Sequence, residues 1–93
     1  MSLYPVPVSL TLIDRGSKYG DFLRMSDCAQ RLRTIIRAYA KTDMECYKYE
    51  ALEMICLKMA RLVCGDSNNR DSWHDIEGYA RLAGDLLTPK EEA

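Results

Sequence analysis

Two pairs of carboxylates stand at helical spacing in the second half of the chain. Glu50 and Glu53 are three residues apart, and Asp71 and Asp75 are four apart, so each pair lies on one face of a helix. Two facing helices with four carboxylates could hold Mg²⁺, which prefers oxygen ligands, and the metal could activate water against a di- or triphosphate. In the structural alternative, Glu50 and Glu53 are solvated and Asp71 caps a helix.

Two cations lie close to the first carboxylate pair. Lys58 and Arg61 are three residues apart, beyond Glu53 on the same expected helix. They could grip a phosphate, and an arginine could do so with two parallel hydrogen bonds. The alternative is that Arg61 pairs with Asp66, Asp71 or Asp75 across the join between two helices. Both readings place Arg61 at that join.

The two aromatic residues beside the second carboxylate pair are weaker indications of a functional site. His74 is the only histidine, and it could bind a ligand, hold a metal or act in catalysis, or simply lie at the surface or cap a helix. The positive end of a helix would disfavour its protonation. Trp73 could stack on a base, but we expect it to be a core residue.

A third group of ligand candidates surrounds the glycine turn near the N-terminus. The group consists of Arg15, Lys18 and Tyr19, close to Gly16 and Gly20. Its two cations, together with flexible backbone amides, could hold an anionic nucleotide. The stretch is not a phosphate-binding fingerprint, because neither GxxxxGK[ST] nor GxGxxG is present. In the alternative reading, Tyr19 packs beneath a polar turn.

Composition restricts the class of protein. The 93 residues allow one small domain, and 47% of them are hydrophobic, which favours a folded protein over disorder. Such a short chain often completes its core by self-association, so we expect a homo-oligomer. The net charge of -1 gives no basic excess for non-specific binding to nucleic acid.

The cysteines and the apolar runs indicate the compartment. The four cysteines form no CxxC pair, and we expect them to be buried and reduced rather than in disulfides or on zinc. No secretory leader is recognisable, and no apolar run approaches the roughly 20 residues that span a bilayer. These features predict a cytoplasmic protein without a membrane partner, located in the host cytoplasm if a phage encodes it.

The hydrophobic period predicts an all-α fold. A short helix over 9–15 and three longer ones form a small antiparallel bundle, with an extended segment over 1–8, a single helical domain over 9–88 and a frayed tail over 89–93. The longer helices are expected over 21–40, 45–64 and from Asp71 or Ser72 to Thr88. The expected N-cap is Asp21 for the first of these helices, Thr42 or Asp43 for the second, and Asp71 or Ser72 for the third. Gly65 is expected to end the second helix as a left-handed C-cap. Expected core positions include Phe22, Met25, Ile35, Tyr39, Leu52, Met59, Trp73, Ile76 and Leu86.

Three segments resemble a family of small phage and prophage proteins of unknown function. They are residues 15–22 (RGSKYGDF), 54–66 (MICLKMARLVCGD) and 71–80 (DSWHDIEGYA), which match R..YGD, MI..K.AR...GD and D.W.DI.GYA in the same order. The resemblance implies a viral or prophage origin and a helical fold, but it gives no established activity.

The layout is also distantly similar to the all-α nucleoside triphosphate pyrophosphohydrolases of the MazG and dimeric dUTPase kind. Their ExxE helix and following ExxD helix bind Mg²⁺ in an oligomeric bundle. The resemblance places Glu50 and Glu53 on ExxE. The second motif differs from ExxD, because Asp71 and Asp75 form DxxxD. This difference leaves ligand binding without hydrolysis as an alternative.

Three functions remain open at this point. The first is a phage or prophage protein that binds a nucleotide or a nucleotide-derived second messenger and sequesters it, as in counter-defence. The second is a Mg²⁺-dependent pyrophosphohydrolase. The third is an interaction module that inhibits a host protein. We favour nucleotide binding, because cations are mixed among the acids and the second acidic motif is broken.

Overall fold

The computed structural model describes residues 21–88, and this part of the chain is helical without strands. It contains α2 (Phe22–Tyr39), α3 (Cys46–Cys64) and α4 (Arg70–Gly84). The all-α prediction is therefore confirmed. The short helix expected over 9–15 and the glycine turn that follows it lie outside the described residues.

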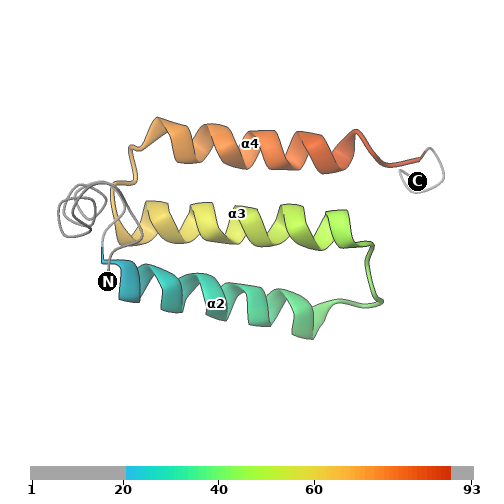
Figure 1. Cartoon of the computed structure of the whole chain (residues 1–93), viewed down its shortest axis with the longest axis horizontal. Coiled ribbons are helices and arrows are strands. Elements are labelled where there is room, and N and C mark those ends of the chain that lie inside the picture. The colour runs from blue at the N-terminus through green and yellow to red at the C-terminus, as the bar shows by residue number, and fades with distance from the viewer. Residues whose placement is uncertain (1–20, 89–93) are drawn as a thin grey trace, which may run out of the picture.

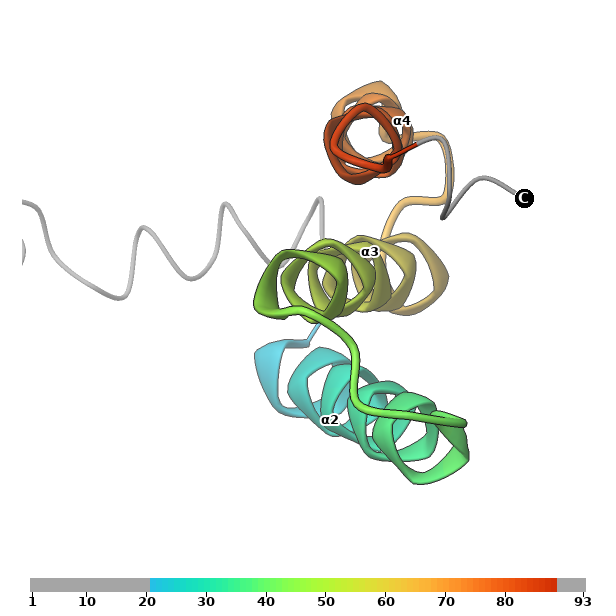
Figure 2. The ribbon, with the colours of Figure 1, turned by 90° about the vertical axis from the view of Figure 1, so that its right-hand side faces the viewer.

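The three helices form a single open layer with α3 in the middle. Successive helices run antiparallel (Figure 1). The view along the helices shows α4 and α2 on opposite sides of α3 (Figure 2). Within residues 21–88, α3 contacts both of its neighbours, whereas α2 and α4 share no contact. Two faces of the layer are therefore left uncovered by the described helices.

The start of α2 agrees with the sequence prediction. Asp21 has an extended backbone, and its Oδ1 accepts a hydrogen bond from the backbone N–H of Leu23 at 2.8 Å. This is the usual N-cap, which satisfies one of the free N–H groups in the first helical turn. The helix ends at Tyr39, so the predicted end at Ala40 was one residue too late.

The expected N-cap of α3 was wrong, whereas Gly65 is the C-cap as expected but lacks the expected left-handed conformation. The N-cap is Glu45 instead of Thr42 or Asp43, and its side chain makes no capping bond but pairs with Lys48 at 2.9 Å. Gly65 has φ -133°, which is not left-handed. The chain reverses after it through Asp66, whose Oδ1 accepts from Asn68 N–H at 2.9 Å, so the turn needs no left-handed glycine.

The start of α4 also differs from the prediction. Asn69 is the N-cap, and its Oδ1 accepts from the backbone N–H groups of Asp71 at 3.1 Å and Ser72 at 3.4 Å. Asp71 and Ser72 therefore lie inside the first turn and are capped by Asn69. The helix ends at Gly84, earlier than the expected end at Thr88.

The core of the described layer is small and contains few large side chains. Its buried hydrophobic residues are Met25, Ala29, Ala51, Cys56, Ala60 and Leu62. Trp73, which we expected in the core, is 57% exposed, because one neighbouring helix covers only a narrow strip of α4. Other expected core residues that are exposed are Phe22, Ile35, Tyr39, Leu52, Met59 and Leu86. Within residues 21–88, no helix has the length and apolar character needed to cross a bilayer.

We predict that the protein is a homodimer or a larger oligomer. Val63 and Leu82 are 74% and 64% exposed, and covering such side chains with a second copy would remove apolar surface from water. Size-exclusion chromatography with light scattering should give more than one chain per particle, and the melting temperature should rise with protein concentration. A monomer at micromolar concentration with a constant melting temperature would contradict this expectation.

A second prediction tests the start of α4. Asn69→Ala should reduce the free energy of unfolding by about 1 kcal/mol, because two N–H groups lose their acceptor. Glu45→Ala is the matched control, since Glu45 caps α3 without a side-chain bond, and it should have a smaller effect. Urea denaturation followed by circular dichroism gives both values. Equal losses in the two variants would show that the Asn69 side chain is not the cap.

Candidate functional site

An ion pair joins α3 to α4 near the middle of the layer. The Nζ of Lys58 lies 3.0 Å from Oδ2 of Asp75. The Lys58 side chain is only 12% exposed, and that of Asp75 is 41% exposed. Lys58 is therefore a largely desolvated cation, for which an anionic partner is needed to offset the loss of water.

Arg61 lies one turn beyond Lys58 on α3. It is partly buried, and its Nε is buried. Because α3 and α4 run antiparallel, Asp71 lies level with the turn that contains Arg61, one turn from Asp75. The structure thus pairs Lys58 with Asp75 between two helices, and Arg61 and Asp71 each follow or precede that pair by one helical turn.

Arg33 of α2 is a third cation of this region, and the sequence analysis missed it. It is partly buried, and its Nε is buried without a hydrogen bond to the described residues. Burial raises the pKa of the Cys56 thiol on α3, and the nearby charge of Arg33 opposes that rise. Arg33 therefore lies against the middle of α3. Arg33 falls outside the apolar stripe that the helical period gives for α2, and no sequence signal showed its burial.

Arg33 and Arg61 share one face of the layer. Ile35 and Val63 line a groove on one side, between α2 and α3. Residues two apart in a helix point in nearly opposite directions, so Arg33 and Arg61 lie on the other side. We call Arg33, Lys58 and Arg61, together with Asp75, the cation face. Asp75 belongs to it through its ion pair with Lys58.

The four carboxylates predicted to hold Mg²⁺ are not gathered at one point. Glu53 faces α2, where its Oε2 accepts from the Arg37 Nε at 2.6 Å, while Asp75 pairs with Lys58. Glu50 and Asp71 are exposed. Within residues 21–88, no group of three or more His, Cys, Asp or Glu side chains is arranged to hold a metal ion.

The other predicted ligand residues lie apart from the cation face or outside the described residues. Trp73 points its indole at the loop before α4, and its Nε1 donates to the Ser67 carbonyl at 2.8 Å. His74 is exposed. Arg15, Lys18 and Tyr19 belong to the part of the chain that the structure does not describe.

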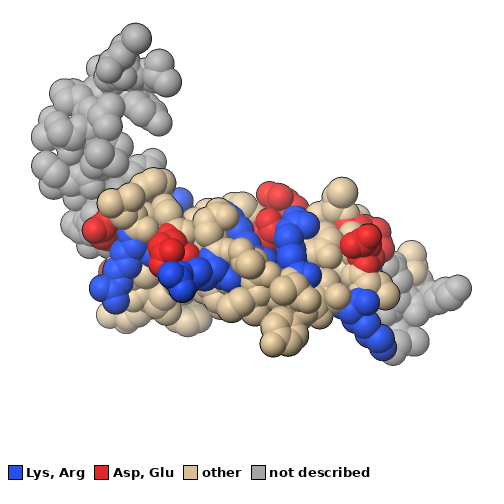
Figure 3. Space-filling model, turned by 90° about the horizontal axis from the view of Figure 1, so that it is seen from below, with Lys and Arg blue, Asp and Glu red and all other residues tan. Residues whose placement is uncertain are grey.

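The outer side of α2 presents charges of both signs. Figure 3, seen from that side, shows Lys and Arg interspersed with Asp and Glu. Arg31 and Asp27 form one such pair at 3.0 Å, with 78% and 64% of their side chains exposed. Such exposed pairs add little to stability and create no strong field of one sign.

We predict that Asp75→Asn destabilises the protein by about 1–2 kcal/mol, because it leaves the nearly buried Lys58 without its carboxylate. Asp27→Asn is the matched control: the Arg31–Asp27 pair has the same 3.0 Å separation but is exposed, so its loss should cost less than about 0.5 kcal/mol. Urea denaturation gives both values. The Lys58→Met, Asp75→Leu double variant should recover stability relative to Asp75→Asn. Equal effects at both pairs would contradict the importance of burial.

Comparison with known proteins gives a family but no activity. Residues 8–87 match the model of a family described as a domain of unknown function, DUF6378. The match covers most of the chain and includes all three described helices. No curated protein matches the chain, and no solved structure matches it.

Proposed function

This chain belongs to the DUF6378 family, and we propose that it binds the phosphate groups of a nucleotide or nucleotide-derived second messenger on the cation face. The observation that carries the proposal is the partly buried row of Arg33, Lys58 and Arg61, of which Lys58 has Asp75 as its ion-pair partner. A phosphate would supply the negative charge and oxygen acceptors that such a row favours.

The two arginines and the lysine have different parts in this proposal. A guanidinium presents N–H donors in a planar fork that matches phosphate oxygens, whereas a lysine acts as a point charge. The Nε of Arg33 is buried without a hydrogen bond to residues 21–88, so the terminal nitrogens of its guanidinium are the donors that a bound phosphate would use. Lys58 would keep Asp75 as a partner and add charge nearby.

We propose that the protein binds the nucleotide without hydrolysing it. Two of the four predicted metal ligands already have cationic partners, because Glu53 pairs with Arg37 and Asp75 with Lys58. An ammonium or guanidinium at a carboxylate competes with Mg²⁺ for the same oxygens. The geometry therefore favours a phosphate on the cations over a metal on the acids.

The biological role proposed for this binding is sequestration. The resemblance to small phage and prophage proteins supports a protein that withholds a nucleotide signal from its host. Sequestration needs affinity and a sufficient number of copies, but no turnover, so it is compatible with carboxylates that are committed to ion pairs.

The test is a thermal-shift screen of the purified full chain. The probes are ATP, dATP, ADP, a cyclic dinucleotide and NAD, each with and without Mg²⁺. We expect at least one probe to raise the melting temperature by several degrees without requiring Mg²⁺, because ligands that bind only the native state stabilise it. The shift should decrease with added salt, since phosphate contacts are screened.

Variants then place the binding on the cation face. Arg33→Lys and Arg61→Lys keep the charge but remove the planar fork, so each should lower affinity at least about tenfold in titration calorimetry. Arg31→Lys is the matched control, because Arg31 is exposed and paired with Asp27. Wild-type affinity in both test variants would place the ligand elsewhere.

Two other outcomes reject the proposal as a whole. A shift that requires Mg²⁺ and is followed by pyrophosphate release would support the hydrolase. A screen without any shift would leave the interaction module as the better function and direct the search to protein partners.

A further inference from the structure

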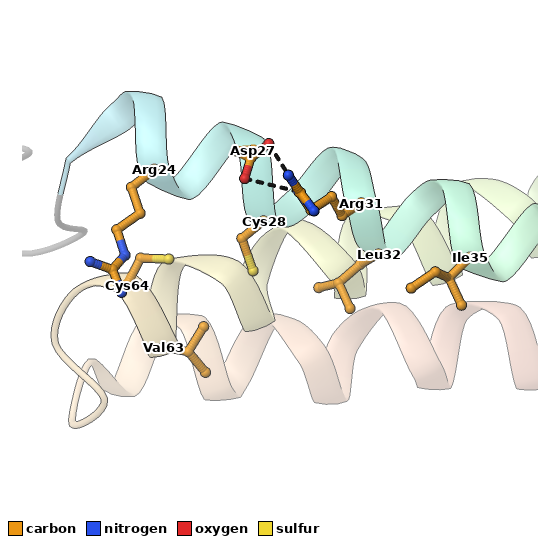
Figure 4. A pocket seen from close by; sticks show the side chains of 8 residues that line it. All are labelled: Arg24, Asp27, Cys28, Arg31, Leu32, Ile35, Val63 and Cys64. Carbon is orange, nitrogen blue, oxygen red and sulfur yellow. Dashed lines mark hydrogen bonds and ion pairs between the residues drawn. The ribbon is translucent and has the colours of Figure 1, made fainter.

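A groove opens between α2 and α3 on the face opposite the cation face. Its volume is about 560 Å³. Figure 4 shows side chains of both helices around it, with the two sulfur atoms of Cys28 and Cys64 turned toward the same space. The lining residues are Arg24, Asp27, Cys28, Arg31, Leu32, Ile35, Val63 and Cys64.

The two cysteines of the groove lie near each other on α2 and α3. Cys28 and Cys64 are free, partly buried thiols that pack against the same core cluster of Met25, Ala29 and Ala60. Both side chains line the same groove, and Cys64 is near enough to raise the pKa of the Cys28 thiol. The other two cysteines are placed differently, since Cys46 is exposed and Cys56 is buried.

We propose that Cys28 and Cys64 are a modification site that forms a reversible disulfide with a small disulfide oxidant such as oxidised glutathione. The thiolate of one cysteine attacks the oxidant, breaks its S–S bond and releases one glutathione. The second thiolate attacks the mixed disulfide and releases the other glutathione. Two protein S–H bonds are lost, one S–S bond forms, and the oxidant is reduced to two thiols that carry the two hydrogens.

The packing of α2 on α3 brings the two backbones close at this point. A disulfide requires Cα atoms about 4.4–6.8 Å apart. Ala29, next to Cys28, and Ala60, one turn before Cys64, are fully buried between the helices, and such small side chains let two helices approach each other. This close approach is what would let the Cys28 and Cys64 thiols, which line the same groove, reach bonding distance.

A disulfide between Cys28 and Cys64 would link the two helices at the end of the hairpin where the chain does not connect them. The chain connects α2 to α3 between Tyr39 and Cys46, whereas the start of α2 and the end of α3 lie at the other end of this helical hairpin (Figure 1). A Cys28–Cys64 bond would tie this open end of the helical hairpin. It would also change the floor of the groove without touching the cation face.

The surroundings of Cys28 predict how its reaction depends on pH. Burial, Cys64 and the Asp27 carboxylate raise the pKa of the Cys28 thiol, and Arg24 partly opposes them. Only the thiolate attacks a disulfide, so Cys28 should react slowly at neutral pH. Cross-linking should become faster as the pH rises toward and beyond the ordinary thiol value of 9.0.

Peptide mapping of the folded full chain tests the proposal. Trypsin should place the four cysteines on four separate peptides, at residues 25–31, 42–48, 49–58 and 62–70. After oxidised glutathione at pH 8, we expect the intact mass of the cross-linked protein to fall by about 2 Da and the peptides 25–31 and 62–70 to be joined. Dithiothreitol should reverse both changes.

Variants and denaturation supply the controls. Cys46→Ser, at the exposed thiol, should still cross-link, whereas Cys28→Ser and Cys64→Ser should not. In concentrated guanidinium chloride, the preference for the 25–31 and 62–70 peptides should disappear, because it depends on the fold. The cross-linked protein should melt several degrees higher than the reduced one, since the bond restricts the unfolded chain.

Three results would overturn the inference. One is a stable glutathione adduct on Cys28 or Cys64 that does not resolve to the internal bond. Another is a bond that forms mainly through Cys46 between chains. The third is the same peptide pairing in folded and denatured protein. None of these results bears on nucleotide binding, so the two proposals fail independently.

Discussion

The packing of α2 and α4 against opposite sides of one central helix is the constraint on which the described structure depends. Helix α3 contacts both neighbours, and they do not contact each other. Small residues such as Ala29 and Ala60 lie where α2 meets α3, and they allow close approach at the cost of little buried apolar area. The layer therefore exposes more large apolar side chains than it buries.

The same constraint separates two kinds of surface. On α3, Val63 lies on the groove face and Arg61 on the other. One face combines apolar side chains with a pair of thiols, and the other combines partly buried cations with the ion pair of Lys58 and Asp75. Because a single helix carries both, a substitution that rotates or shifts α3 would disturb both surfaces together.

The sequence predicted local features better than spatial ones. The Asp21 cap and three long antiparallel helices could be predicted, because capping chemistry and the helical period act within a few residues. The exposure of Trp73 could not be predicted, since the period gives a stripe of positions but not the width that a neighbouring helix covers. Asp75 does lie between α3 and α4, where it pairs with Lys58, whereas Arg33 was missed because its burial depends on the register of α2 against α3.

The indole of Trp73 has a consequence of its own. It is the only tryptophan of the chain, and its Nε1 is hydrogen-bonded to the Ser67 carbonyl in the loop between α3 and α4. Its fluorescence therefore comes from one known position beside the connection of the two helices that carry Lys58 and Asp75. A change in the emission wavelength or anisotropy of this tryptophan would report directly on the ordering of that loop, without any attached dye.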